Sequence, residues 1–319
     1  MNQMPFVYLL LVFVTTQVHA FPTSKPNCAT GPGINKNIGL IHKVVLMGKD
    51  DDRQTIQEYA AANGVDEETV RKQFAATGMI ECGPYITTIQ LSGAKNMVTA
   101  ASHAFHRVRP PSLQPDPKNP TECSFFKPTD CKVRFPLTGS NRVYKIKENS
   151  MDSGGCPARD IKADWAFFEL TEDVSGATPY ALPPAENKVP VNLEILQVAY
   201  HADNFRPGLR KTPISHYNFI KCKVRSQQVF RNASLHTDCD TGGGTSGAGQ
   251  LVGWNDKIIL MAISVGYKSN LPDPNNPNDI RPAWSDYNTA IHSSVSVPLE
   301  GEFLRKLRER VNVRVSGGH

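Results

Sequence analysis

Hydrophobic and polar positions change their period along the chain. The apolar run Lys43–Met47 predicts a short strand, which ends at the polar segment Gly48–Arg53. From Thr55 to Ala76, apolar residues recur at three- and four-residue spacing, which is typical of a helix with one buried face. Asn63-Gly64 interrupts this pattern. We therefore expect two consecutive short helices in this region.

From Cys82 onward, the helical pattern nearly disappears and short β-rich runs alternate with turns rich in Pro, Gly and Asn. Regularly spaced short strands favour a sandwich or closed barrels. The predicted strands include Tyr85–Leu91, Met97–Ala100, Val143–Ile146, Trp165–Leu170, Leu193–Tyr200 and Lys257–Val265. An amphipathic helix is expected over Glu300–Val311. Residues 21–37 are expected to form an extended arm, and Pro110–Pro120 and Leu271–Pro282 long surface loops.

The N-terminal residues predict the cellular compartment of the protein. The apolar run Phe6–Val14 and the small-residue exit Val18-His19-Ala20 are typical of a secretory signal peptide over residues 1–20, and the run is too short to span a bilayer. We expect a mature chain that begins near Phe21 and is secreted. The 39% apolar and 20% charged content is typical of a globular protein. The net charge of +5 comes from scattered basic residues, so the composition does not favour a nucleic-acid partner.

The seven cysteines are expected to form disulfides in an exported chain, with one thiol left over. No CxxC pair is present and no Cys/His group has zinc-ligand spacing, so no metal site is expected. Cys123 with Cys131 would close a short loop, and Cys222 with Cys239 would tether the glycine-rich segment that follows. Sequence alone does not determine connectivity, and both pairings are hypotheses.

The segment Cys239–Gly249 carries the clearest chemical signal. Glycines surround a single hydroxyl at Ser246 and allow the backbone to turn tightly beside a ligand. A nucleophilic serine needs this arrangement, with its own N–H and that of Gly244 directed at a developing oxyanion. Such runs are also common in flexible loops, so a base and a carboxylate must come from elsewhere in the chain.

The candidate base is His103, because an apolar strand runs into small residues and ends at this imidazole. Three other histidines, His42, His106 and His201, are expected on the surface. The candidate carboxylate is Asp164, which opens an apolar strand and is costly to bury without a partner. A histidine is one such partner, because the aspartate would set its tautomer. Asp164 could instead be a turn residue, and Asp160 is its local rival.

The order His103, Asp164, Ser246 differs from the Ser-Asp-His order of α/β-hydrolase esterases. The motifs around these residues resemble those of trypsin-like serine proteases with the chymotrypsin fold. Val98-Thr99-Ala100-Ala101-Ser102-His103 resembles the histidine motif, Asp164-Trp165-Ala166-Phe167 the aspartate motif, and Gly244-Thr245-Ser246-Gly247 the serine motif. Ile263-Ser264-Val265-Gly266 resembles the strand that binds the substrate backbone.

This resemblance covers Val44 to Val311 and implies a mostly β fold with two antiparallel six-stranded β-barrels. The barrels would span residues 80–180 and 190–298 of a peptidase domain at 80–319, which ends with a helix over residues 300–311. Residues 21–79 would form an N-terminal arm and a helical insertion. The insertion is unusual for the family, and we expect an inert decoration rather than a propeptide remnant or a regulatory cover.

The segments Gly48–Arg53 and His236–Thr241 look closer to the glutamyl-endopeptidase-like, largely microbial branch. The resemblance implies that the substrate contacts Asp240, Thr241, Ser264 and Gly266. Asp240 stands where trypsin-like enzymes place a carboxylate under a Lys/Arg pocket, yet in the other branch this aspartate can be structural. Both interpretations stay open. Glutamyl specificity is less favoured, because Ile263 occupies a position where that branch often has a histidine.

The implied function is a secreted, monomeric endopeptidase that acts on proteins or peptides through an acyl-enzyme, without a metal or organic cofactor, nucleic acid or membrane partner. Several departures from the family pattern bear on this function. Ser102 is inserted before the histidine, no cysteine follows His103, and Thr245 replaces the aspartate of the zymogen switch. The alternative is a non-catalytic protease-like binding protein in which Ser102 has displaced His103.

Overall fold

We describe a computed structural model of the chain over residues 46–47, 50–83, 85–105, 126–155, 161–185, 188–202, 214–228, 234–268, 284–285 and 293–316. The predicted signal peptide, the arm over residues 21–37 and the two long loops predicted from Pro and Asn content lie outside these ranges.

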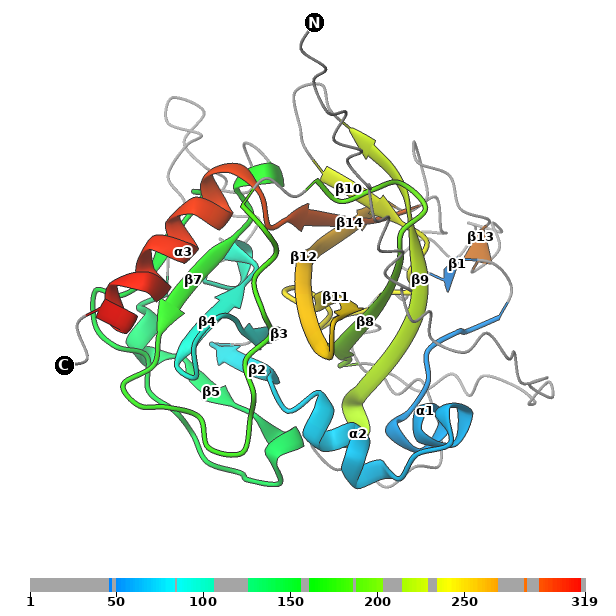
Figure 1. Ribbon diagram of the computed structural model, residues 1–319, viewed down its shortest axis with the longest axis horizontal. Coiled ribbons are helices and arrows are strands. Elements are labelled where there is room, and N and C mark those ends of the chain that lie inside the picture. Colours follow the sequence, from blue (N-terminus) through cyan, green and yellow to red (C-terminus); the bar gives the residue numbers. More distant parts are fainter. Residues whose placement is uncertain are drawn as a thin grey trace, which may run out of the picture.

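The C-terminal half forms a closed antiparallel barrel with the strand order β10-β14-β12-β11-β8-β9 (Figure 1). The strands are β8 (Glu194–Tyr200), β9 (Tyr217–Gln228), β10 (Ser234–Thr237), β11 (Gly249–Trp254), β12 (Lys257–Lys268) and β14 (Ser293–Pro298). The sequence predicted β8 to within a residue and the first part of β12.

The N-terminal half forms a six-stranded sheet with the order β5-β2-β3-β4-β7-β6. Its strands are β2 (Thr77–Cys82), β3 (Tyr85–Leu91), β4 (Met97–Ala100), β5 (Lys132–Arg134), β6 (Asp152–Ser153) and β7 (Ala166–Glu169). The predicted strand Val143–Ile146 is not formed. Instead, single bridges pair Tyr144 with Val133 and Ile146 with Leu170, and they link the two sides of the sheet. The mostly β prediction with two six-stranded units is confirmed, but here only the C-terminal unit is a closed barrel.

The two helices predicted between Thr55 and Ala76 are confirmed as α1 (Ile56–Asn63) and α2 (Glu67–Gln73). Thr55 and Glu58 form a reciprocal capping box at the start of α1. Gly64 ends α1 with a φ of 66°, a conformation that glycine adopts without strain. The third helix, α3 (Gly301–Ser316), begins where predicted and continues beyond Val311. No helix in the described part of the chain is long and apolar enough to cross a membrane.

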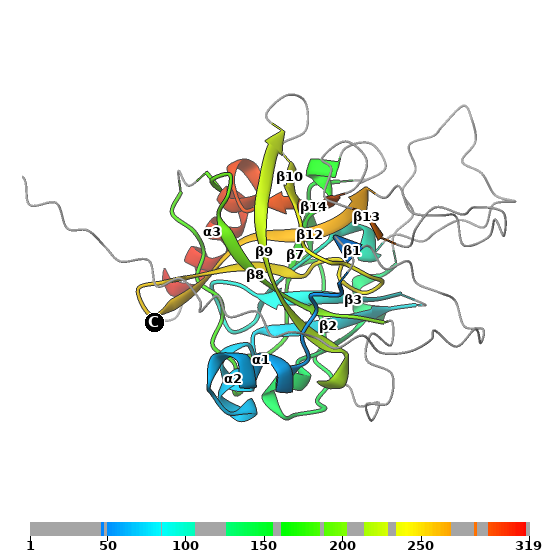
Figure 2. The same cartoon turned by 90° about the vertical axis from the view of Figure 1, so that its right-hand side faces the viewer.

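The α1–α2 pair is part of the core rather than a decoration. Tyr59 of α1 stacks on Phe219 of β9 with ring centroids 4.7 Å apart, and Phe74, directly after α2, meets both rings edge-on. All three side chains are at most 3% exposed. Figures 1 and 2 both show the two helices together at one end of the molecule. The expectation of an inert insertion is therefore wrong, because the helices cover apolar surface of the barrel.

Two disulfides are present among the described residues. Cys222–Cys239 is confirmed. The predicted Cys123–Cys131 bond is wrong, because Cys131 bonds Cys82. The register explains this pairing: Glu81 of β2 lies opposite Lys132 of β5, so the next antiparallel pair brings Cys82 opposite Cys131, with Cα atoms 4.5 Å apart.

The aromatic contact between the helices and the barrel predicts a large stability effect. Phe74→Ala should lower the free energy of unfolding by about 3–5 kcal/mol, because it leaves a cavity between α1 and β9. Urea denaturation would measure the change. Val65→Ala is the control, since Val65 is 39% exposed and contributes little. Equal losses for the two variants would show that the helices do not share the core.

Candidate active site

The Ser246 loop connects β10 to β11 and packs against the opposite half of the molecule. Gly247 has a φ of 80°, and a Cβ atom at this position would lie 2.1 Å from the carbonyl oxygen of Thr88 in β3. No side chain fits there. The glycine that follows Ser246 is therefore required by the close approach of two backbones.

Thr88 holds this loop. Its backbone N–H is shared between the carbonyl oxygens of Gly244 at 3.0 Å and Ser246 at 2.9 Å. Its hydroxyl donates to the Gly244 carbonyl at 2.7 Å and accepts from the N–H of Tyr200 at 2.9 Å. By contrast, the N–H groups of Gly244 and Ser246 donate to no acceptor within the described ranges.

His103 and Asp164 come from the N-terminal sheet. A 3₁₀ turn over Ser102–Phe105 follows β4 and carries His103, and Asp164 precedes β7, the neighbour of β4. One oxygen of Asp164 accepts the His103 N–H at 2.9 Å and the other lies 2.7 Å from Nδ1. The carboxylate is 3% exposed, so both of its interactions are shielded from water.

The two halves meet where Nε2 of His103 lies 2.7 Å from Oγ of Ser246. The His103 side chain is 33% exposed, so solvent and ligands can reach it. The structure does not show the displacement of His103 on which the alternative depends: Ser102 begins the 3₁₀ turn, and the imidazole reaches Ser246. The arrangement combines a partly exposed hydroxyl, a base bonded to it and a buried carboxylate behind the base.

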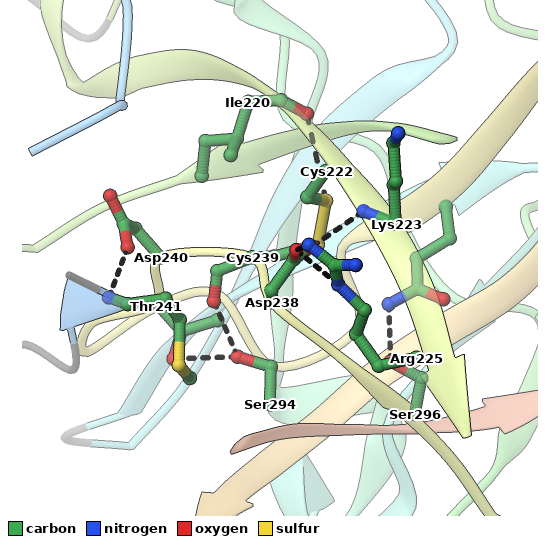
Figure 3. The surroundings of a disulfide bond; sticks show 12 residues. Ile220, Cys222, Lys223, Arg225, Asp238, Cys239, Asp240, Thr241, Ser294 and Ser296 are labelled. Atoms are coloured by element: carbon green, nitrogen blue, oxygen red, sulfur yellow. Dashed lines mark hydrogen bonds and ion pairs between the residues drawn. A yellow bond between two sulfur atoms is a disulfide. The ribbon is translucent and has the colours of Figure 1, made fainter. Parts of the chain in front are cut away.

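The carboxylate of Asp240 accepts two hydrogen bonds from the N-terminal segment. One carboxylate oxygen accepts the Met47 N–H at 2.7 Å and the other accepts the Asp52 N–H at 2.8 Å. Figure 3 shows the first of these bonds beside the Cys222–Cys239 disulfide. Burial raises the pKa of Asp240 to about 7, against the two backbone hydrogen bonds, which lower it. These contacts favour the structural interpretation of this carboxylate over the pocket floor.

The same segment also contacts the barrel at His201. The Arg53 side chain is 2% exposed, forms an ion pair with Asp51 and lies 2.7 Å from Nδ1 of His201. His201 is fully buried, so its expected surface position is wrong. The next residue, Ala202, donates its N–H to the Gly243 carbonyl at 2.7 Å. The segment Leu46–Arg53 thus contacts the Ser246 loop at Asp240 and, through His201, next to Gly243. At its start, β1 (Leu46–Met47) pairs in parallel with β13 (Trp284–Ser285).

The other predicted substrate-binding residues lie around the same loop. Ser264 of β12 accepts the Gly247 N–H at 2.6 Å and donates its own N–H to Ala248 at 2.8 Å. Gly266 lies beyond a register shift on the same strand and is half-buried. Thr241 is buried and accepts a hydrogen bond from Ser294 at 3.2 Å (Figure 3).

Sequence reasoning did not identify Thr88 or Arg53 as parts of this site. The signal for Thr88 was weak but present, since two adjacent threonines interrupt the apolar strand Tyr85–Leu91. Arg53 belongs to the segment Gly48–Arg53 that resembles the glutamyl-endopeptidase-like branch, but its burial had no signal, because an arginine after three aspartates is typical of an exposed turn. Within the described ranges, no group of three or more His, Cys, Asp or Glu residues could hold a metal ion.

Solved structures share this architecture. The chain is similar to the structure of a Glu endopeptidase in complex with MPD, with a TM-score of 0.56 and 14% identity, over 84% of this chain and 100% of that one. Two further likenesses are weaker. A thermostable serine protease, AL20, from an extremophilic microorganism has a TM-score of 0.48 and 10% identity, over 78% and 100% of the two chains. The protease Anisep from Arthrobacter nicotinovorans has 0.47 and 11%, over 75% and 96%.

No protein-family model and no curated protein matches the chain. The structural likeness therefore shows the fold. The chain has the chymotrypsin-like fold.

The position of Asp240 predicts a pH-dependent stability. Its pKa is raised from 3.8 to about 7 in the folded state, so the native protein binds this proton between pH 4 and 7 and the unfolded chain does not. The contribution of Asp240 to stability is therefore complete below pH 4 and decreases as the pH rises to 7. Urea denaturation across this range should show that wild type and Asp240→Asn differ most at low pH.

Below pH 4, Asp240→Asn should lose about 1–3 kcal/mol, because the amide nitrogen cannot accept a backbone N–H, and this loss should shrink as the pH rises to 7. The exposed Asp173→Asn is the control and should unfold like the wild type. A difference between Asp240→Asn and wild type that stays constant from pH 4 to pH 8 would contradict the raised pKa.

Proposed function

We propose that the protein is a serine endopeptidase that cleaves peptide bonds through an acyl-enzyme. The observation that carries this proposal is the pair of 2.7 Å contacts of His103, from Nε2 to Ser246 Oγ and from Nδ1 to Asp164 Oδ2. A serine hydroxyl is a weak nucleophile until a neighbouring base accepts its proton, and this geometry provides the base.

In the proposed reaction, Ser246 Oγ attacks the scissile carbonyl carbon while His103 takes the hydroxyl proton. Asp164 holds the Nδ1–H tautomer and stabilises the imidazolium that forms. His103 then gives the proton to the leaving amine as the peptide C–N bond breaks, which leaves an ester on Ser246. Water attacks this ester with His103 again as the base, and the acid product leaves.

The oxygen of the attacked carbonyl becomes negatively charged in the tetrahedral intermediate. The N–H groups of Gly244 and Ser246 are the proposed donors to it, because Thr88 anchors the carbonyls of both residues and leaves their N–H groups unused. Preorganised donors of this kind contribute about 2.7–4 kcal/mol each to transition-state stabilisation. No metal or organic cofactor takes part in the proposed chemistry.

We propose that the substrate does not place a cationic side chain on Asp240. Both oxygens of this carboxylate accept backbone N–H groups, and the side chain is 1% exposed. The name Glu endopeptidase belongs to the similar solved structure. In this chain, Ile263 stands where we expected a histidine for that specificity. Thr241, Ser264 and Gly266 remain the proposed substrate contacts.

We also propose that the enzyme is exported and acts as a monomer on protein or peptide substrates. The predicted signal peptide at residues 1–20 supports export. The Cys82–Cys131 and Cys222–Cys239 bonds support it as well, because disulfides persist mainly in oxidising compartments.

A fluorophosphonate probe tests the reaction class. The wild type should gain one probe mass on Ser246, because the His103-activated hydroxyl attacks phosphorus as it would attack a carbonyl. Ser246→Ala should not be labelled, and His103→Ala should lose most of the labelling and at least 10³-fold in kcat/KM. Mass spectrometry of the intact protein and of its peptides would measure this. Labelling that survives Ser246→Ala, or its absence from wild type, rules out the proposal.

Cleavage of a peptide library tests the specificity. Because Asp240 is occupied, Lys and Arg should not predominate at the cleaved position, and sequencing of the products would reveal the preference. A matched library digested by Asp240→Asn should give the same preference at a lower total rate. Predominant cleavage after Lys or Arg in wild type, lost in the variant, would make Asp240 a pocket floor.

A further inference from the structure

Ser102 immediately precedes the candidate base and is the residue by which the chain departs from the family's histidine motif. Its side chain is fully buried. Its hydroxyl donates to the carbonyl oxygen of Gly155 at 2.8 Å. A buried hydroxyl with a good acceptor keeps one orientation, so this bond ties the start of the His103 turn to the segment that follows β6.

That segment is attached to the residues around Asp164. The N–H of Gly154 donates to the carbonyl of Trp165 at 2.9 Å, and β6 pairs with the start of β7. A Cβ atom at Gly154 would lie 2.6 Å from the carbonyl oxygen of Ala163, so the two backbones are in close contact. The residues on both sides of Asp164 thus support the segment that Ser102 binds.

These hydrogen bonds and peptide links form a ring of contacts that begins and ends at the turn carrying His103. His103 binds Asp164 through its ring and its N–H, Asp164 continues into Trp165, Trp165 binds Gly154, and Gly155 binds Ser102, which precedes His103. We propose that Ser102 is a positioning residue that fixes the His103 ring relative to Asp164 and Ser246. This inference rests on the proposed function, because the position of the ring matters only if His103 transfers protons.

The turn that carries His103 lacks a contact expected from the family pattern to hold it in place. The turn that carries His103 is a single 3₁₀ turn, and no cysteine follows the histidine to tie it down. A ring displaced by about 1 Å loses much of its proton-transfer efficiency, because reacting atoms must stay in near-attack geometry. The hydroxyl of Ser102 acts through His103 and has no role in the chemical step itself.

Steady-state kinetics of Ser102→Ala test this inference. The variant should lose about 3- to 10-fold in kcat with KM changed less than about 2-fold, because the Ser102–Gly155 hydrogen bond is removed and the proposed substrate contacts remain. The rate of fluorophosphonate labelling should fall by the same factor. Ser102→Thr keeps a hydroxyl at the same position and should recover most of kcat.

Ser150→Ala is the matched control. Ser150 is 3% exposed, and its hydroxyl donates to the Lys147 carbonyl at 2.6 Å and accepts the Glu169 N–H at 3.1 Å. Its removal therefore costs at least as many hydrogen bonds, but away from the three candidate residues. It should lower the free energy of unfolding while kcat stays at the wild-type value. Should Ser102→Ala fail to fold, Ser102→Cys carries the same test, since a thiol is a weaker donor of similar size.

Unchanged kcat in Ser102→Ala would overturn the inference. So would a loss no larger than that of Ser150→Ala, or a Ser102→Thr enzyme as slow as Ser102→Ala. These outcomes differ from failure of the proposed function, which would appear as a wild-type protein that neither cleaves peptides nor reacts with the probe.

Discussion

The hydrogen bonds of Thr88 join the two halves of the molecule at the point where His103 and Ser246 meet. His103 and Ser246 are 143 positions apart and belong to different six-stranded units, so their 2.7 Å contact depends on how those units meet. Thr88 belongs to the His103 unit, yet it bonds two carbonyls of the Ser246 loop and the N–H of Tyr200 in the barrel. The tight approach at Gly247 leaves no room for a side chain between the two backbones. A shift between the halves would therefore act directly on the contact between His103 and Ser246.

The other side of the Ser246 loop is held in place through the buried carboxylate of Asp240. Burying a charge is costly unless hydrogen bonds compensate for the lost water, and Asp240 obtains two from a segment more than a hundred residues away. Arg53 reaches the neighbouring strand end through His201. The Ser246 loop is thus held from one side by Thr88 and from the other by the segment Leu46–Arg53. This use of Asp240 makes the loop geometry depend on residues outside both six-stranded units.

Local patterns in the sequence predicted local structure well. The breaks at Asn63-Gly64 and the bounds of β3 and β4 follow from the spacing of apolar residues and from glycine conformation. Pairings that depend on register were not accessible, and Cys131 was therefore assigned the wrong partner. His201 was placed on the surface because its burial is decided by Arg53, which lies 148 positions away. The candidate triad could be proposed from its motifs, whereas the residues that hold it in place are visible only in three dimensions.

The fold is retained at 14% identity to a solved Glu endopeptidase, so it does not depend on a large set of shared side chains. In this chain the candidate site brings a hydroxyl, an imidazole and a carboxylate to hydrogen-bonding distance, and that arrangement needs a stiff backbone. Different chemistry can supply the stiffness. Here the turn that carries His103 is tied by the hydroxyl of Ser102, and β2 is tied to β5 by Cys82–Cys131. In this chain, a residue that departs from the histidine motif forms the hydrogen bond that supports the turn carrying His103.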